Sequence, residues 1–485
     1  MTRHRPSPPS APSRLRRSSV RSLWFPVIVL ALCAAAAMLL WLPALRYPIV
    51  EDTAVYALLG RSFWREGTFT LLGEPFTRQL PFHAILSYPL TIPFGYQLGM
   101  KLSSLLAGIG VCIVSYFLFR RTVGMVAGLA VAALIALHPG FTYMTMVGSA
   151  DLLFTFLFLL AILLYIKAKE DPRWYLAMGA ATGLACLTRY NAVALFPLFL
   201  VAPILVRPNS DTPARRPYSA WWYWGGLALG ILIFSLWFIR NTITFGNPFA
   251  IGYVGEFQQN TPGVLQMSYR NVLYYLNPAH NVFFLLFPFA LYGLWKEGRR
   301  QLFLVLSMFA AWPLTLVWHV QGIRFAFPGY PILIGFSVLG IVAFLRWGKR
   351  WVPWLLVLLL AAFIVEHTFF YCIYAYGQCN AAFDRTVGLL PPNIGLSTEG
   401  FASWDDARDY INTHAETGAL VAAGSPADAV VWQQGVFRPG LHVIGVPPVP
   451  CQPVYAITQH PQPGDTILYT SPDAPRASVV LQGCQ

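Results

Sequence analysis

The sequence is poor in charged residues, and above all in acidic ones. Only 11% of its 485 residues are charged, with 20 Asp and Glu against 33 Lys and Arg, whereas 56% are hydrophobic. An ordinary soluble domain has about 25% charged residues, so this composition excludes a soluble enzyme and indicates an integral membrane protein. Only 11 of the 20 acids precede residue 372. In the apolar part of such a chain, each acid needs a functional explanation.

Several ligand-binding motifs are also lacking. The sequence has no Cys-x-x-Cys pair and no Cys/His cluster, so no zinc site is expected. It has no Walker-type loop, no G-x-G-x-x-G loop and no internal repeat, which argues against common nucleotide-binding folds. The net charge of +13 fits attraction to anionic membrane lipid, and no nucleic acid partner is expected.

Long apolar runs dominate the chain. The first, from Leu23 to Leu42, is long enough to cross a membrane, and it is too long for a cleaved signal peptide, the alternative interpretation. Together the runs predict an all-α polytopic protein with about 11 transmembrane helices, at residues 23–42, 98–119, 123–138, 151–166, 174–188, 191–206, 221–239, 281–295, 302–319, 325–345 and 352–371.

The distribution of charge predicts the orientation of these spans. Residues 1–23 read as a disordered basic tail, and with the alternate connections they hold 20 of the 33 basic residues, so this side is expected to be cytoplasmic. The other side holds 16 of the 20 acids. Residues 24–371 therefore form a transmembrane domain in the plasma (inner) membrane, with extracytoplasmic loops at 44–97 and 240–280.

Residues 372–485 are polar and rich in Pro and Gly, which predicts a small extracytoplasmic α/β domain. Residues 404–414 read as an amphipathic helix, and residues 420–431 and 441–446 as strands. Four cysteines could form two disulfide bridges there in any of three pairings: Cys372, Cys379, Cys451 and Cys484.

Two acidic sites lie at the outer ends of predicted helices. Glu51 and Asp52 follow the first span, and Asp52 opens a segment with an apolar face that predicts a helix lying along the membrane. Asp151 begins the fourth span. Either Asp52 or Asp151 could be no more than a helix N-cap.

Two arginines lie at the same predicted side of the membrane. Arg189 is in the short turn between spans five and six, and Arg324 opens the tenth span. Each could merely extend to the lipid headgroups. Neither has an acid nearby in the chain, and guanidinium groups match phosphate geometry, so both are candidate anion ligands.

Residues 24–345 resemble the GT-C superfamily of integral membrane glycosyltransferases, in the branch with protein O-mannosyltransferases and the aminoarabinose lipid A transferase. The resemblance depends on the order of several weak motifs along alternating spans. These motifs are Glu51-Asp52, residues 120–124, 150–154, 183–191, 237–241 with 245–248, and 324–328 with Pro331.

The resemblance implies transfer of a sugar from a polyprenyl-phosphate donor to a hydroxyl of a protein, lipid or glycan acceptor, with inversion, on the non-cytoplasmic face. It implies that Asp52 is the general base, Glu51 a neighbour or substitute, and Asp151 an orienting group. Arg189 and Arg324 would bind the lipid phosphate. Because a monophosphate leaving group needs one or two fixed cations, no metal and no other cofactor is expected.

Two further residues are substrate-binding candidates. Tyr56 lies one turn beyond Asp52 and could reach the same cavity. His83 follows Gln79-Leu80-Pro81-Phe82, which departs from the Glu-Lys-Pro-Pro pattern of the aminoarabinose enzyme, and it could equally be a packed histidine.

Two other functions remain open at this point. A transporter or flippase of lipid-linked sugars would explain the spans, but it would favour ionisable groups near mid-membrane and an internal repeat. A non-catalytic scaffold for envelope assembly would leave Asp52 and Asp151 dispensable.

Overall fold

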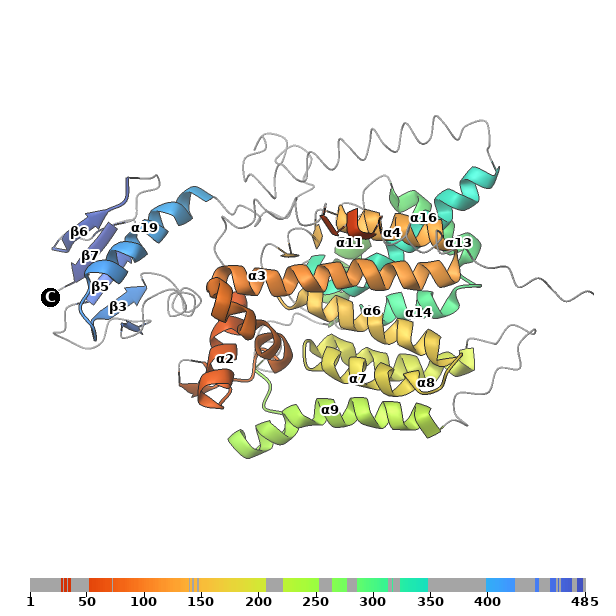
Figure 1. Cartoon of the computed structure of the whole chain (residues 1–485), viewed down its shortest axis with the longest axis horizontal. Helices are drawn as coiled ribbons and strands as arrows, with labels where there is room; N and C mark the ends of the chain where they lie inside the picture. The colour runs from red at the N-terminus through yellow and green to blue at the C-terminus, as the bar shows by residue number, and fades with distance from the viewer. Residues whose placement is uncertain are drawn as a thin grey trace, which may run out of the picture.

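A computed structural model describes most of the chain (Figure 1). The described residues are 52–71, 73–138, 140–141, 144–145, 148–205, 221–252, 264–276, 286–312, 323–347, 398–423, 441–444, 454–458, 464–472 and 478–482, with a few isolated positions. Glu51, most of the first expected span, the whole of the last, and the four cysteines beyond residue 371 lie outside these residues. Nothing can therefore be said of the disulfide pairings.

The predicted helical membrane domain is confirmed, and each apolar run between residues 98 and 345 contains a helix. Within the described residues, four helices are long and apolar enough to cross a membrane, at Leu98–Thr122, Asp151–Ala168, Trp221–Phe245 and Arg324–Arg346. The described helices are α2 (Asp52–Glu66), α3 (Pro81–Thr122), α4 (Met125–Ala136), α6 (Asp151–Ala168), α7 (Trp174–Cys186), η2 (Tyr190–Ala194), α8 (Leu195–Leu205), α9 (Trp221–Phe245), α11 (Val264–Leu276), α13 (Phe287–Glu297), α14 (Leu302–Ala310), η5 (Ile323–Gly329) and α16 (Tyr330–Trp347).

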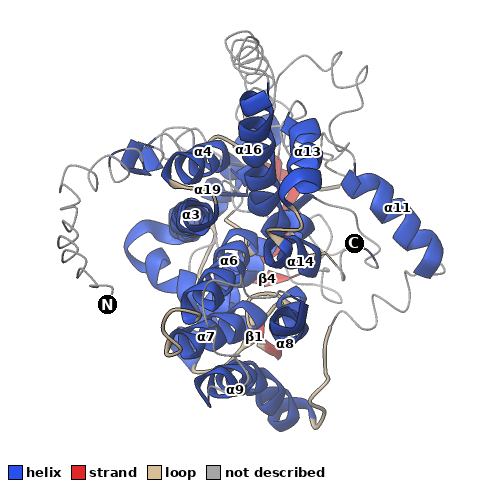
Figure 2. Ribbon diagram, turned by 90° about the vertical axis from the view of Figure 1, so that its right-hand side faces the viewer, coloured by secondary structure: helices blue, strands red, loops and turns tan. Residues whose placement is uncertain are grey.

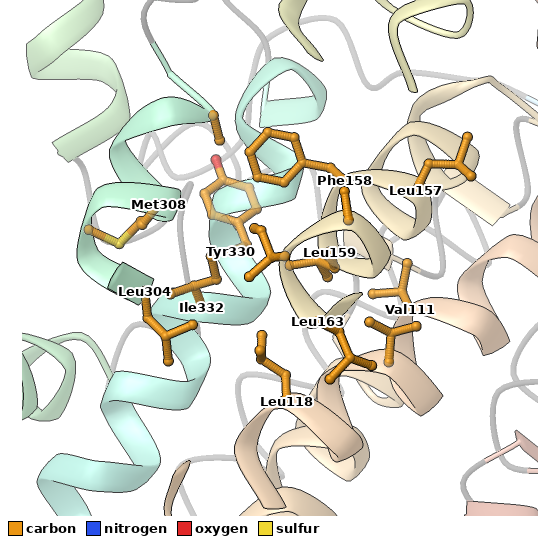
Figure 3. Close-up of a cluster of buried hydrophobic side chains, with 14 of the residues drawn as sticks. Val111, Leu118, Leu157, Phe158, Leu159, Leu163, Leu304, Met308, Tyr330 and Ile332 are labelled. Atoms are coloured by element: carbon orange, nitrogen blue, oxygen red, sulfur yellow. The ribbon is translucent and has the colours of Figure 1, made fainter. Parts of the chain in front are cut away.

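Helix α6 lies at the centre of the bundle. Figure 2 looks along the helices and shows α3, α6, α7 and α9 side by side, with α14 and α16 next to α6. Because α6 is apolar on all sides, it can be buried on all sides, and most of its side chains are. Figure 3 shows its side chains Phe158, Leu159 and Leu163 packed among Val111 and Tyr330 of neighbouring helices.

Glycines allow neighbouring helices to approach closely. Gly179 and Gly183 of α7 face Gly226 and Gly230 of α9, and a Cβ atom at Gly179 would overlap the carbonyl oxygen of Gly226. Such pairs of small residues four positions apart bring helix backbones into contact in membranes, where packing has to replace the hydrophobic effect. A single glycine in each helix allows a close approach of α13 and α16, since a Cβ atom at Gly293 or Gly340 would overlap a carbonyl oxygen of the other helix.

The expected outer loop at residues 44–97 is partly helical. It contains α2, a hairpin of β1 (Thr70–Leu71) and β2 (Glu74–Pro75), and the first part of α3, which is interrupted at Gly95, where φ is 75°. Pro89 lacks an N–H group, so the carbonyl of Ile85 has no helical partner. The indole Nε1 of Trp64 in α2 donates to this carbonyl at 2.8 Å. The proline thus creates the acceptor that ties α2 to α3.

The prediction that α2 has a single apolar face is wrong, whereas its position along the membrane stays a prediction. Residues 53–60 are all buried, on every side of the helix, although Phe63 is partly exposed. The reason is that α2 is enclosed by α3 and by side chains of the turn after α7 and of α9, including Leu187 and Trp237. Gly60 allows this packing, because a Cβ atom there would lie 2.5 Å from the carbonyl oxygen of Ala84.

The C-terminal domain is α/β, as predicted. Its helix α19 (Thr398–His414) packs against a sheet through Ala407 and Ile411. Strands β4, β3 and β5 are parallel, while β7 and β6 are antiparallel to their neighbours, and only β3 and β4 were predicted from sequence. The order is β4 (His442–Ile444), β3 (Leu420–Ala423), β5 (Val454–Thr458), β7 (Ser478–Gln482) and β6 (Thr466–Thr470).

Candidate functional site

Four of the charged residues predicted from sequence meet at one end of the helix bundle. Asp52 is the first residue of α2, Asp151 the first of α6, Arg189 precedes η2, and Arg324 lies in η5. The opposite end of the 18-residue helix α6 is basic, and the two ends are ~27 Å apart.

Asp52 and Arg324 form an ion pair across 272 residues of sequence. The Nη1 atom of Arg324 lies 3.2 Å from Oδ2 of Asp52. The other carboxylate oxygen, Oδ1, accepts a hydrogen bond of 3.0 Å from Nε2 of Gln79. The side chains of Asp52 and Arg324 are 28% and 30% exposed. Asp52 is thus open to solvent, but each of its oxygens already has a donor.

Asp151 and Arg189 form a second, more deeply buried pair. The Nη2 atom of Arg189 lies 2.7 Å from Oδ1 of Asp151, and their side chains are 16% and 1% exposed, respectively. Oδ2 of Asp151 accepts a hydrogen bond from Ser149 at 2.8 Å. Ala150 holds the N-cap position of α6, so Asp151 does not serve as the cap. Both arginines therefore have carboxylate partners, and these partners are distant in the chain.

One aromatic ring brings the two pairs together. The Cζ atom of Arg324 lies 5.1 Å from the centroid of Phe325, and that of Arg189 lies 5.8 Å from the same centroid. Cation–π attraction favours both positions. The two guanidinium groups thus border one ring.

The turn before α6 fixes Asp151 relative to Asp52. Gly148 adopts a φ of 76°, and a Cβ atom there would lie 3.1 Å from Cγ2 of Thr53, the neighbour of Asp52. Ser104 of α3 donates to the carbonyl of Ser149 at 2.9 Å. These contacts hold α2, α3 and the start of α6 as one unit.

His83 and Tyr56 lie behind this turn, and neither faces solvent. His83 is fully buried, Tyr56 is 4% exposed, and their rings meet edge to face at 4.8 Å. His83 lies outside the span that begins at Leu98. Burial lowers the pKa of His83 to about 4; its hydrogen bond to the Gly148 carbonyl opposes the shift, and the charge of Arg189 adds to it. The ring is therefore neutral near pH 7 and supports the turn from behind.

Two residues of the site were missed by sequence reasoning. Gln79 is uncharged, and its only signal was the departure of residues 79–82 from the Glu-Lys-Pro-Pro pattern. Arg240 of α9 lies inside one of the quoted motifs, but no role was assigned to it. Its guanidinium donates to the carbonyls of Phe69 and Phe76, at 2.8 and 3.0 Å, and so holds the β1–β2 hairpin against α9.

Metal-ligating side chains do not gather in the described part of the chain. Among those residues, no group of three or more His, Cys, Asp or Glu could hold a metal ion. The positive charge of the two ion pairs is that of the guanidinium groups of Arg189 and Arg324.

Part of the chain matches a known family model. Residues 86–239, which include Asp151 and Arg189, match the family model described as dolichyl-phosphate-mannose-protein mannosyltransferase. No curated protein matches the sequence.

Three solved structures share the fold. ArnT from Cupriavidus metallidurans in the apo state has a TM-score of 0.66 at 18% identity, covering 96% of this chain and 98% of that one. ArnT from the same organism bound to undecaprenyl phosphate has a TM-score of 0.64 at 16% identity, covering 93% and 97%. The archaeal oligosaccharyltransferase AglB from Archaeoglobus fulgidus, in complex with an inhibitory peptide and a dolichol-phosphate, has a TM-score of 0.55 at 13% identity, covering 87% and 65%. The chain thus shares the fold of the ArnT and AglB structures, and its residues 86–239 match the mannosyltransferase family model.

Proposed function

We propose that this protein transfers a sugar from a polyprenyl-phosphate donor to an acceptor hydroxyl, with inversion at the anomeric carbon and without a metal. The observation that carries the proposal is the meeting of two carboxylate–guanidinium pairs around Phe325. A base for the acceptor and cations for the leaving phosphate are thereby adjacent.

Asp52 has the geometry required of the general base. Its side chain is 28% exposed, so an acceptor hydroxyl can approach it, and Arg324 is in contact with it. In the reaction the acceptor oxygen bonds to the anomeric carbon and its proton passes to Asp52. The bond from that carbon to the phosphate oxygen breaks, and its electron pair stays on the phosphate.

Arg324 and Arg189 would bind the phosphate as negative charge grows on it. Guanidinium groups match phosphate geometry, and two of them supply the charge that a monophosphate leaving group requires. Asp151 would fix Arg189 and orient a sugar or acceptor hydroxyl. Glu51 stays a candidate neighbour or substitute for Asp52.

Two comparisons support the choice of donor. One ArnT structure contains undecaprenyl phosphate and one AglB structure contains a dolichol-phosphate. We place the reaction on the non-cytoplasmic face because the opposite end of the bundle carries the basic cluster Arg120, Arg121 and Lys167, which the positive-inside rule assigns to the cytoplasm.

The test uses purified protein in lipid nanodiscs with a panel of polyprenyl-phosphate sugars. Release of free polyprenyl phosphate measures transfer, and acceptor glycans, lipids and peptides are varied in turn. Asp52→Asn is expected to lower turnover at least about 100-fold, whereas the matched change Asp171→Asn at the basic end is expected to leave it unchanged.

Two results would contradict the proposal. One is equal turnover by the Asp52→Asn variant and the wild type. The other is movement of intact lipid-linked sugar across the membrane with no release of lipid phosphate, which would favour a flippase.

A further inference from the structure

We infer that Gln79 is a positioning residue that holds one oxygen of Asp52 while Arg324 moves from the other oxygen to the donor phosphate. The inference builds on the proposed function and assigns different tasks to the two hydrogen-bond donors of the base. Gln79 would be the permanent partner of Asp52, and Arg324 the exchangeable one.

The environment of Gln79 supports a permanent role. The residue lies just before α3 and is 3% exposed, and its Nε2 donates to Oδ1 of Asp52 at 3.0 Å. Its own carbonyl oxygen, Oε1, is buried and has no hydrogen-bond partner among the described residues. Leaving a buried acceptor unpaired is unfavourable. The amide of Gln79 is therefore oriented so that its nitrogen donates to Asp52 while its oxygen stays without a hydrogen bond. This is expected for a residue that positions a neighbouring side chain.

The environment of Arg324 supports an exchangeable role. Its pair with Asp52 is nearly one-third exposed on both sides, so water screens the attraction. The pair of Asp151 and Arg189 is much less exposed, and separating those two charges would leave a buried charge without compensation. An arriving phosphate can therefore draw Arg324 away far more easily than Arg189.

Exchange of Arg324 has a direct chemical consequence. While Arg324 is bonded to Oδ2 of Asp52, it occupies one acceptor position of that oxygen and competes with an acceptor hydroxyl. Transfer of Arg324 to the donor phosphate frees Oδ2, and Gln79 then keeps the carboxylate from rotating away. The geometry points to ordered binding, in which the lipid-linked donor enters before the acceptor.

The first variant, Gln79→Met, keeps the size of the side chain but removes the hydrogen bond. Because misplacing a reacting group by about 1 Å can cost about 100-fold in rate, we expect kcat to fall about 10- to 100-fold. The affinity for undecaprenyl phosphate should be unchanged, since Arg324 and Arg189 remain. A hydrogen bond to a carboxylate favours its ionised form, so the acid limb of the pH–rate profile should move to higher pH.

The second variant, Gln79→Glu, keeps the shape and adds a carboxyl group next to Asp52. The pair can still share one proton, and the protonated Glu can donate to Asp52. Activity should therefore return in a pH window in which the pair holds one proton and fall again at high pH, giving a bell-shaped profile. A residue needed only for folding would change stability and leave the profile as it is. Gln301→Met, at the start of α14, is the control that removes an amide far from Asp52 in sequence.

The inference and the proposed function fail in different ways. If the wild type releases lipid phosphate but Gln79→Met matches its kcat and pH profile, the positioning role is wrong. A loss of undecaprenyl phosphate affinity in Gln79→Met equal to that in Arg324→Ala would also overturn it, because Gln79 would then serve the donor. If the wild type transfers no sugar from any donor, the proposed function itself is wrong.

Discussion

The same chemical change at the two acidic positions should have very unequal consequences for stability. In Asp151→Asn, Arg189 keeps its charge in a site where the lost carboxylate was 1% exposed. Removing one member of a buried ion pair typically costs about 3–5 kcal/mol. In Asp52→Asn, the pair lost is partly exposed, and such pairs contribute about 0–1 kcal/mol. The first variant should be markedly destabilised, and the second should be close to wild type in stability.

Thermal unfolding in nanodiscs, followed by intrinsic fluorescence, measures this difference. We expect Asp151→Asn to melt several degrees below Asp52→Asn, and the double variant Asp151→Asn/Arg189→Met to melt above Asp151→Asn, because it removes the uncompensated charge. Equal melting temperatures for the two single variants would refute the assignment of one fixed and one exchangeable pair. So would a double variant less stable than Asp151→Asn.

Three further predictions concern the surroundings of the site. The pKa of His83 is about 4 in the fold against 6.5 for the free group. The neutral ring therefore contributes fully to stability above pH 6.5, and about 3 kcal/mol of stability is lost as the pH falls toward 4. His83→Gln should make the melting temperature less dependent on pH over this range, and an unchanged pH dependence would contradict the assignment. Gly226→Ala should destabilise the protein by about 1–3 kcal/mol, because a Cβ atom there overlaps the carbonyl of Tyr175. Gly225→Ala should be neutral or stabilising, because a Cβ atom there lies at an ordinary contact distance of 3.5 Å from Cδ2 of Leu176. Arg240→Gln should free the β1–β2 hairpin and speed its cleavage in limited proteolysis; protection equal to wild type would show that other contacts hold the hairpin.

The parts of the fold that could be predicted from the sequence are those that depend on local sequence patterns. Apolar runs long enough to form membrane helices are visible without knowledge of neighbours, and every run between residues 98 and 345 contains a helix. Strands β5, β6 and β7 were missed, because five-residue strands within a polar, Pro-rich segment have little local signal. Burial of α2 on every side could not be predicted either, since it depends on side chains contributed by α3, the turn after α7, and α9.

Part of the candidate site could also be predicted from the sequence, and part could not. Position at a helix end and scarcity of acids were enough to select Asp52, Asp151, Arg189 and Arg324, but their catalytic and binding roles remain predictions. The pairing of the arginines could not be predicted, since the acid that pairs with Arg324 lies 272 residues away. Gln79 was missed because an amide is conspicuous only when its hydrogen-bond partner is known.

The unequal exposure of the two ion pairs also bears on how the proposed transfer could be inhibited. A lipid phosphonate that lacks a sugar would displace the carboxylate most easily from Arg324, where both partners already touch water. Once bound, it would leave Asp52 uncovered but present no glycosyl centre for the acceptor to attack. Selective blockers should therefore be sought among anionic lipid mimics, with substituents chosen for the ring of Phe325 between the two cations.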